Sequence, residues 1–124
     1  MSEIDWAKHR ASIDSLLRLE DGWDSYNAPA PNAIAAEGAR MGLECAREAG
    51  AVLWCVSPSS VGGIGLVFSV PKRYADIEFF NDGEVAMIKS VRAERQEAMM
   101  VERTKEGVAA AIRDIQAFIT NTGE

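Results

Sequence analysis

The sequence predicts a two-layer α+β domain: two N-terminal helices, a largely antiparallel sheet of four or five strands, and a C-terminal helix. Apolar residues recur at three- and four-residue steps over 2–19, 33–49 and 108–119, which is the period of amphipathic helices. Between them, from residue 52, apolar and polar residues largely alternate, as in strands. Short turns between these strands favour antiparallel pairing, with helices covering one face. We expect one domain over residues 1–124, because this length is typical of a single core.

The first helix is expected to open with a capping box of Ser2 and Asp5 and to run to about Leu19. Gly22 is expected to end it by taking a left-handed conformation. Residues 20–32 then form a loop with two prolines and two large aromatic side chains.

The second helix is expected to start after the N-cap residue Asn32 and to stop at Gly50. Glycine inside a helix lowers stability by roughly 1 kcal/mol relative to alanine. Close packing of the first helix or of the sheet would explain why small residues line one side of this helix. These residues are Ala35, Gly38, Ala39, Gly42, Ala46 and Ala49.

The first strand is expected over Val52–Val56, a continuous apolar run typical of a strand buried on both faces, with Trp54 in the core. A half-buried strand follows from Ile64 to Val70. Residues 74–80 alternate again, with Ala75, Ile77 and Phe79 inward and Asp76 and Glu78 outward.

The segment Asn81-Asp82-Gly83 predicts a tight hairpin turn, since such turns need positive φ. Residues 84–89 are the paired strand, and residues 96–102 favour a further strand over a helix. The last helix is expected to close near Gly123.

The net charge of −6 argues against direct nucleic-acid binding, which needs clustered basic residues. The best basic patch is Lys89, Arg92 and Arg95; Glu94 interrupts it, and a solvated surface is the favoured interpretation. No apolar run approaches the ~20 residues of a membrane span, and the first residues do not resemble a signal peptide. We therefore expect a cytoplasmic protein.

No cofactor is expected. Cys45 and Cys55 are interpreted as buried thiols, and with one histidine, His9, they do not make up a usual zinc-ligand set. No nucleophile–histidine–acid arrangement is evident, and the glycines at 62–65 lead into a strand, so they do not offer a helix N-terminus to a phosphate. The sequence therefore predicts a protein that is not an enzyme.

One combination of features resembles a known group of proteins. It consists of the loop Gly22-Trp23-Asp24-Ser25-Tyr26 with Ala28, then a helix, Gly62-Gly63 and an Asp82-Gly83 hairpin. It is similar to a loosely defined group of small uncharacterised bacterial proteins with a G-W-D-x-Y-x-A loop and a glycine-opened β-meander. The resemblance covers about two thirds of the chain and implies a bacterial or phage origin.

Four carboxylates, Asp76, Glu78, Asp82 and Glu84, fall in the stretch between Arg73 and Lys89, which has no basic residue. Three interpretations are open: a solvated strand face, a magnesium site, or a surface that contacts a basic partner. Trp23 and Tyr26 either pack over the core or act as anchors at an interface.

These features lead to the hypothesis of a small non-enzymatic bacterial or phage protein that binds and inhibits a protein partner. Immunity proteins, antitoxins and inhibitors of host defence are such proteins. Its partner-binding residues would be Asp76, Glu78, Asp82, Glu84, Trp23 and Tyr26. The alternatives are a metal-dependent enzyme that uses the clustered carboxylates, and a structural subunit or homodimer that self-associates through the small-residue helix or a sheet edge.

Overall fold

The structure, a computed structural model, describes residues 5–91 and 96–120. Its helices are α1 (Trp6–Leu16), α2 (Ala33–Ala49) and α3 (Lys105–Thr120). Its strands are β1 (Cys55–Ser59), β2 (Gly63–Val70), β3 (Arg73–Phe80), β4 (Val85–Val91) and β5 (Gln96–Val101). The strands pair in chain order, each antiparallel to the next. The predicted α+β class is therefore confirmed, with five strands.

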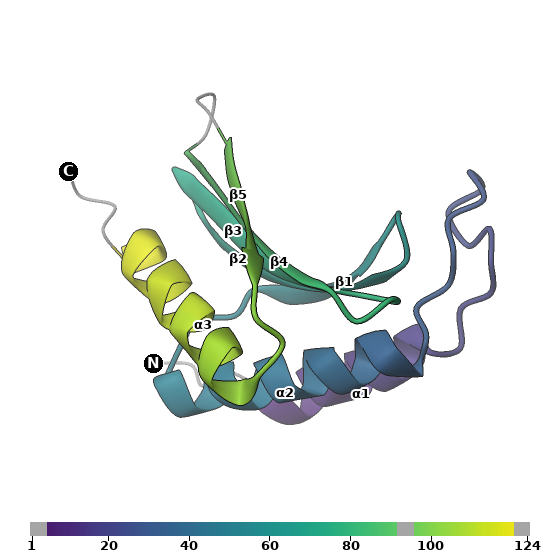
Figure 1. Ribbon diagram of the computed structural model, residues 1–124, viewed down its shortest axis with the longest axis horizontal. Coiled ribbons are helices and arrows are strands. Elements are labelled where there is room, and N and C mark those ends of the chain that lie inside the picture. The colour runs from purple at the N-terminus through teal and green to yellow at the C-terminus, as the bar shows by residue number, and fades with distance from the viewer. Residues whose placement is uncertain (1–4, 92–95, 121–124) are drawn as a thin grey trace.

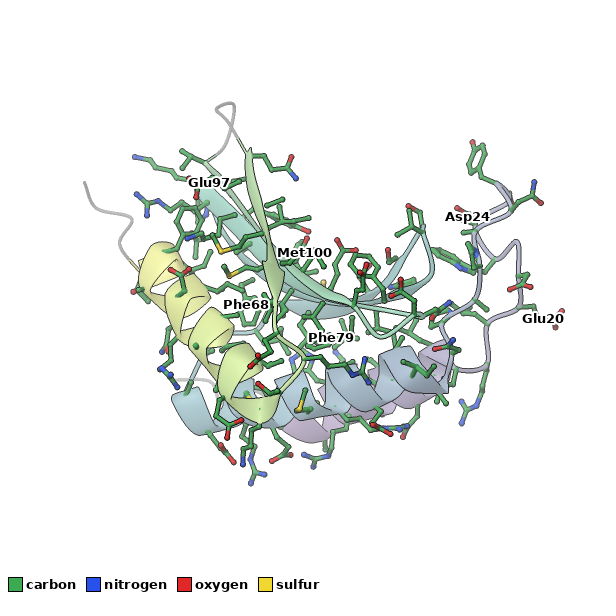
Figure 2. All side chains as sticks on the ribbon, viewed as in Figure 1. Glu20, Asp24, Phe68, Phe79, Glu97 and Met100 are labelled. Atoms are coloured by element: carbon green, nitrogen blue, oxygen red, sulfur yellow. The ribbon has the colours of Figure 1, made fainter. Side chains whose placement is uncertain are left out.

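All three helices lie on one side of the sheet, and the other side is uncovered by the described elements (Figure 1). The alternation along each central strand sends one set of apolar side chains toward the helices, where they form one cluster with helix residues. Figure 2 shows Phe68 and Phe79 in this layer. The strand residues of the cluster are Ile64, Leu66, Phe68, Ala75, Ile77, Phe79, Val85 and Met87.

Helix α1 is shorter than predicted at its C-terminal end. Its N-cap is Asp5, whose side chain accepts a hydrogen bond from the Lys8 backbone N–H at 3.0 Å. Ser2, the other member of the predicted capping box, lies outside the described residues. The helix ends at Leu16 in tight turns, so the prediction that Gly22 ends it was wrong. Gly22 does have φ +83°, but its N–H closes the following loop on the Ala28 carbonyl.

Helix α2 has the predicted ends, Asn32 at the N-cap and Gly50 in the left-handed conformation after the last turn. Its small residues let Phe79 of β3 approach the helix backbone closely. A Cβ added at Gly42 would lie 2.5 Å from the Phe79 ring, and one at Gly38 would lie 2.8 Å from it. The expected close packing is confirmed, and the partner is the sheet.

The first strand lies three residues later than predicted, and Trp54 is not in the core. Ala51 and Leu53 are the residues that this segment buries, so alternation leaves Val52 and Trp54 outside; Trp54 is 63% exposed. Strand β1 begins at Cys55 and passes through Pro58, which is compatible with its place at the edge of the sheet.

The remaining strands lie where predicted, but β2 was expected to be half-buried and its residues from Gly63 to Phe68 are buried on both faces. Ala75, Ile77 and Phe79 are buried in the core, and Gly83 closes the β3–β4 turn with φ +96°. Residues 96–102, for which a strand is favoured over a helix, contain β5, the other edge of the sheet. Gly123, the predicted end of the last helix, lies outside the described residues; α3 is described to Thr120.

Candidate functional site

The open face of the sheet, by which we mean the face opposite the helices, has a cavity of about 180 Å³ over β1, β2 and β3. In Figure 1 the sheet bends upward toward its left end, which runs beside α3, so this face is concave. The residues that line the cavity are Ser57, Pro58, Ser59, Ser60, Gly65, Val67, Tyr74, Asp76 and Glu78.

Gly65 opens the middle of this cavity because it has no side chain where the alternation of β2 would place one. It pairs with Ser57 on one side and with Glu78 on the other. A Cβ at this position would make only ordinary contacts, 3.6 Å from Glu78 Cγ and 3.7 Å from the Ser57 oxygen. Neither the backbone conformation nor crowding requires glycine here. A glycine inside a strand often marks the close approach of a ligand or another chain.

We therefore expect Gly65→Ala to stabilise the fold by roughly 0.5–1 kcal/mol, because alanine loses less backbone entropy on folding. The measurement is the free energy of unfolding in denaturant. Gly63→Ala is the matched control, since its Cβ would lie 2.4 Å from the Phe79 oxygen at φ +156°. That variant should be destabilised, and a loss of stability in Gly65→Ala as well would show that the fold itself requires Gly65.

Asp76 lies on the cavity wall and is only 7% exposed. It is paired across the sheet with Val67 and Ile88, which are apolar. The Tyr74 hydroxyl donates a hydrogen bond to Asp76 Oδ2 at 2.6 Å. Oδ1 is buried and has no hydrogen-bond partner among the residues that the structure describes. An unsatisfied buried carboxylate oxygen is unusual, because leaving it unpaired costs free energy.

Burial raises the pKa of Asp76 to about 6, and the neighbouring Glu78 adds to the increase, while the hydrogen bond from Tyr74 opposes it. Burial, and then the hydrogen bond to Asp76, raise the pKa of Tyr74, so its hydroxyl is neutral and donates at pH 7. Cys55 also raises the pKa of Tyr74. Burial raises the pKa of the Cys55 thiol. At pH 7 the site therefore holds a mostly ionised, largely buried carboxylate with one free oxygen.

The structure separates the four predicted carboxylates into two groups. Asp76 and Glu78 line the same cavity, as the outward alternation of β3 predicted. The expectation that Asp76 is a solvated residue was wrong, because apolar neighbours and Tyr74 cover it. Asp82 and Glu84 lie in the β3–β4 turn and line a second cavity, of about 320 Å³. The other residues lining that cavity are Val61, Gly62, Phe80 and Asn81.

Trp23 and Tyr26 have different environments in the loop between α1 and α2. Trp23 is half-buried, and its Nε1 donates to the Pro29 carbonyl at 3.2 Å, which fits the structural interpretation. Tyr26 is 85% exposed. Asp24 accepts hydrogen bonds from the N–H groups of Tyr26 and Ala28, so it orders the loop and does not cap α2.

Asn81 fixes this loop beside the β3–β4 turn. Its side chain accepts from the Asn32 N–H at 2.9 Å and donates to the Ala30 carbonyl at 3.0 Å. Its own N–H donates to the Gly62 carbonyl in the β1–β2 turn. The loop, which rises at the right of Figures 1 and 2 with Glu20 and Asp24, is therefore attached at the same end of the sheet as Asp82 and Glu84.

The charges of the described residues differ between the two sides of the sheet. The basic strand residues Arg73 and Lys89 point to the helix side, where Arg73 donates to the Phe118 carbonyl and Lys89 pairs with Asp114. The other ion pairs also join residues of the helices or of the segment before α3. Within residues 5–91 and 96–120, no ion pair includes Asp76, Glu78, Asp82 or Glu84.

The predicted basic patch is not assembled by the described residues. Lys89 is turned toward α3, with 15% of its side chain exposed, and Arg92 and Arg95 lie outside the described residues. In the described chain no three His, Cys, Asp or Glu side chains come together to hold a metal ion. Cys45 is buried, Cys55 is half-buried, and both are free. No described helix is long and apolar enough to cross a membrane.

Tyr74, Gly65 and Ser57 belong to the cavity but were not singled out from the sequence. Tyr74 stands two residues before Asp76, so the period of a strand places both on one face. That signal was available in the sequence. Ser57 and Gly65 are brought to the site only by the register of β1, β2 and β3, which pairs Ser57 with Gly65 and Gly65 with Glu78.

No family model, curated protein or solved structure matches this chain.

Proposed function

We propose that this chain is a small non-enzymatic cytoplasmic protein that binds a positively charged partner protein on the open face of its sheet and inhibits it by covering it. Immunity proteins, antitoxins and inhibitors of host defence act in this way. The observation that carries the proposal is the buried, unpaired carboxylate oxygen of Asp76, a residue that lines an acidic cavity on an uncovered sheet face.

Three further features support this proposal. Glu78 adds a second negative charge to the cavity wall, and Asp82 and Glu84 extend the acidic surface to the end of the sheet. These acidic side chains take no part in the ion pairs of the described residues, so their potential is available to a partner. Tyr26 projects into solvent from the loop at that end, and exposed tyrosines are frequent interface anchors.

The two alternatives have less support from the geometry. The described residues bring no metal-ligand set together, so a metal-dependent enzyme is not proposed. The small-residue side of α2 is packed on Phe79 within the chain, so it is not a surface for self-association. The two sheet edges, β1 and β5, are the surfaces left for a homodimer, and Met100 on β5 is 63% exposed.

The test is affinity capture from a lysate of the source cells, using the native chain and Glu78→Lys at low and at high salt. We expect a basic protein that the native chain retains at low salt and loses at high salt. Its affinity, measured afterwards with the purified partner, should fall at least about tenfold for Glu78→Lys, because the substitution places like charges together.

Glu37→Lys is the matched control, since Glu37 carries the same charge on α2 and its side chain is 87% exposed. This variant should bind the partner as the native chain does. Equal binding by Glu78→Lys and the native chain would contradict the proposal. Equal loss in both variants would show an effect of net charge and not of the open face.

A further inference from the structure

We propose that the cavity between β1, β2 and β3 receives the guanidinium group of one arginine side chain of the partner, an inference that rests on the proposed function. The free Asp76 Oδ1 is the acceptor that such a group would satisfy. The other oxygen of the same carboxylate is already bound by Tyr74, so the carboxylate is held in one orientation.

The size of the cavity fits a single side chain. Its volume is about 180 Å³, below the roughly 300 Å³ at which cavities for drug-sized ligands begin. The missing side chain at Gly65 provides part of this space. Ser57 and Glu78, the two residues paired with Gly65, line the cavity on either side of it and bring a hydroxyl and a carboxylate.

The chemistry of the walls favours a guanidinium over an ammonium group. Asp76 and Glu78 lie two residues apart on one strand face, so their α-carbons are about 7 Å apart. A guanidinium has five donors in a rigid plane and reaches acceptors on more than one side. It is also more weakly hydrated than an ammonium, so entering a largely buried site costs it less, and it stacks on aromatic rings such as Tyr74.

Protonation should compete with this cation. The titratable groups that act on Asp76 are Tyr74 and Glu78 on its own strand, and Cys55 on β1 acts on Tyr74. The carboxyl of Asp76 has a pKa of about 6. A bound guanidinium requires the ionised carboxylate, so affinity at pH 5 should be about tenfold lower than at pH 7.

The experiment is a titration of the native chain with N-acetyl-arginine-N-methylamide, followed by the amide signals of the chain in NMR. We expect saturable shifts centred on Gly65, Val67, Tyr74 and Asp76. The affinity should fall about tenfold or more in Asp76→Asn, since this substitution removes the charge that the guanidinium pairs with. Glu37→Gln, on the helix side, is the charge-matched control and should titrate as the native chain does.

Two further probes make the result decisive. The corresponding citrulline derivative has nearly the same shape without the charge and should give no saturable shifts. The lysine derivative should bind more weakly than the arginine derivative. Absence of shifts at the cavity with the arginine derivative, or equal shifts with citrulline or lysine, would overturn the assignment. Because this titration needs no partner protein, its failure is distinguishable from failure of the capture experiment, which would overturn partner binding itself.

Discussion

Phe79→Ala should destabilise the fold by about 3–5 kcal/mol, as expected for truncating a fully buried aromatic ring. The ring fills the space between β3 and α2 and contacts the positions of Gly38 and Gly42. Denaturant unfolding monitored by circular dichroism measures the decrease in the free energy of unfolding. Phe80→Ala is the matched control, because Phe80 lies one residue along on the open face and is half-buried, so its loss should be clearly smaller.

A second substitution at Gly42 tests the proposed cause. Gly42→Ala alone should be destabilising by about 1–3 kcal/mol through its clash with Phe79, although alanine is the better helix former. In the Phe79→Ala background the same change should be much less destabilising, because the clashing ring is gone and the remaining close neighbour is Leu66 Cδ1, at 3.0 Å. Additive effects of the two substitutions would contradict direct packing between these positions.

Asp76→Asn should stabilise the fold at pH 7 by about 1–3 kcal/mol. Asparagine keeps an oxygen for the Tyr74 hydroxyl and removes a buried charge. The pKa of Asp76 is raised from 3.8 to about 6 in the folded chain, so protonation favours folding. The resulting stability is fully present below pH about 4 and is lost as the pH rises through about 6.

The measurement is the free energy of unfolding of both proteins between pH 3 and pH 8. The difference between Asp76→Asn and the native chain should grow between pH about 4 and about 6 and then stay constant. The same comparison for Glu37→Gln, an exposed acid, should show no such step. A difference between the two proteins that does not change between pH about 4 and about 6 would contradict a raised pKa of Asp76 in the folded chain.

Asp76 and Gly65 line one cavity, and at both positions a substitution is predicted to make the fold more stable. Asparagine at position 76 and alanine at position 65 are the residues predicted to stabilise the fold. Departures of this kind from local consistency are expected at functional sites, where the requirements of binding override those of folding. Their coincidence in one cavity supports a role for that cavity.

Helix α2 shows what the sequence predicts well. Its ends follow from Asn32 and Gly50, whose effects on the backbone are local, and its small residues correctly indicated a close neighbour. The strand β1 shows the opposite case. Val52–Val56 is apolar enough to suggest a buried strand, but the register with β2 begins at Cys55, and register is a property of two segments together.

The candidate site was predicted only in part. The alternation of β3 places Asp76 and Glu78 on one face, and that was correct. The burial of Asp76 depends on Val67 and Ile88 in the neighbouring strands, so one strand read alone does not reveal it. The same holds for Ser57, which reaches the cavity through the pairing of β1 with β2.

The contact between Phe79 and α2 has a consequence for the order in which the chain folds during synthesis. Helix α2 is synthesised before Phe79, and until Phe79 is in place its alanine and glycine side has no ring to receive. The strands, in contrast, pair only with their neighbours in the chain, so each hairpin can form as soon as it emerges. The arrival of β3 is therefore the step that fills the alanine and glycine side of α2, and α3, which is made last, completes the core.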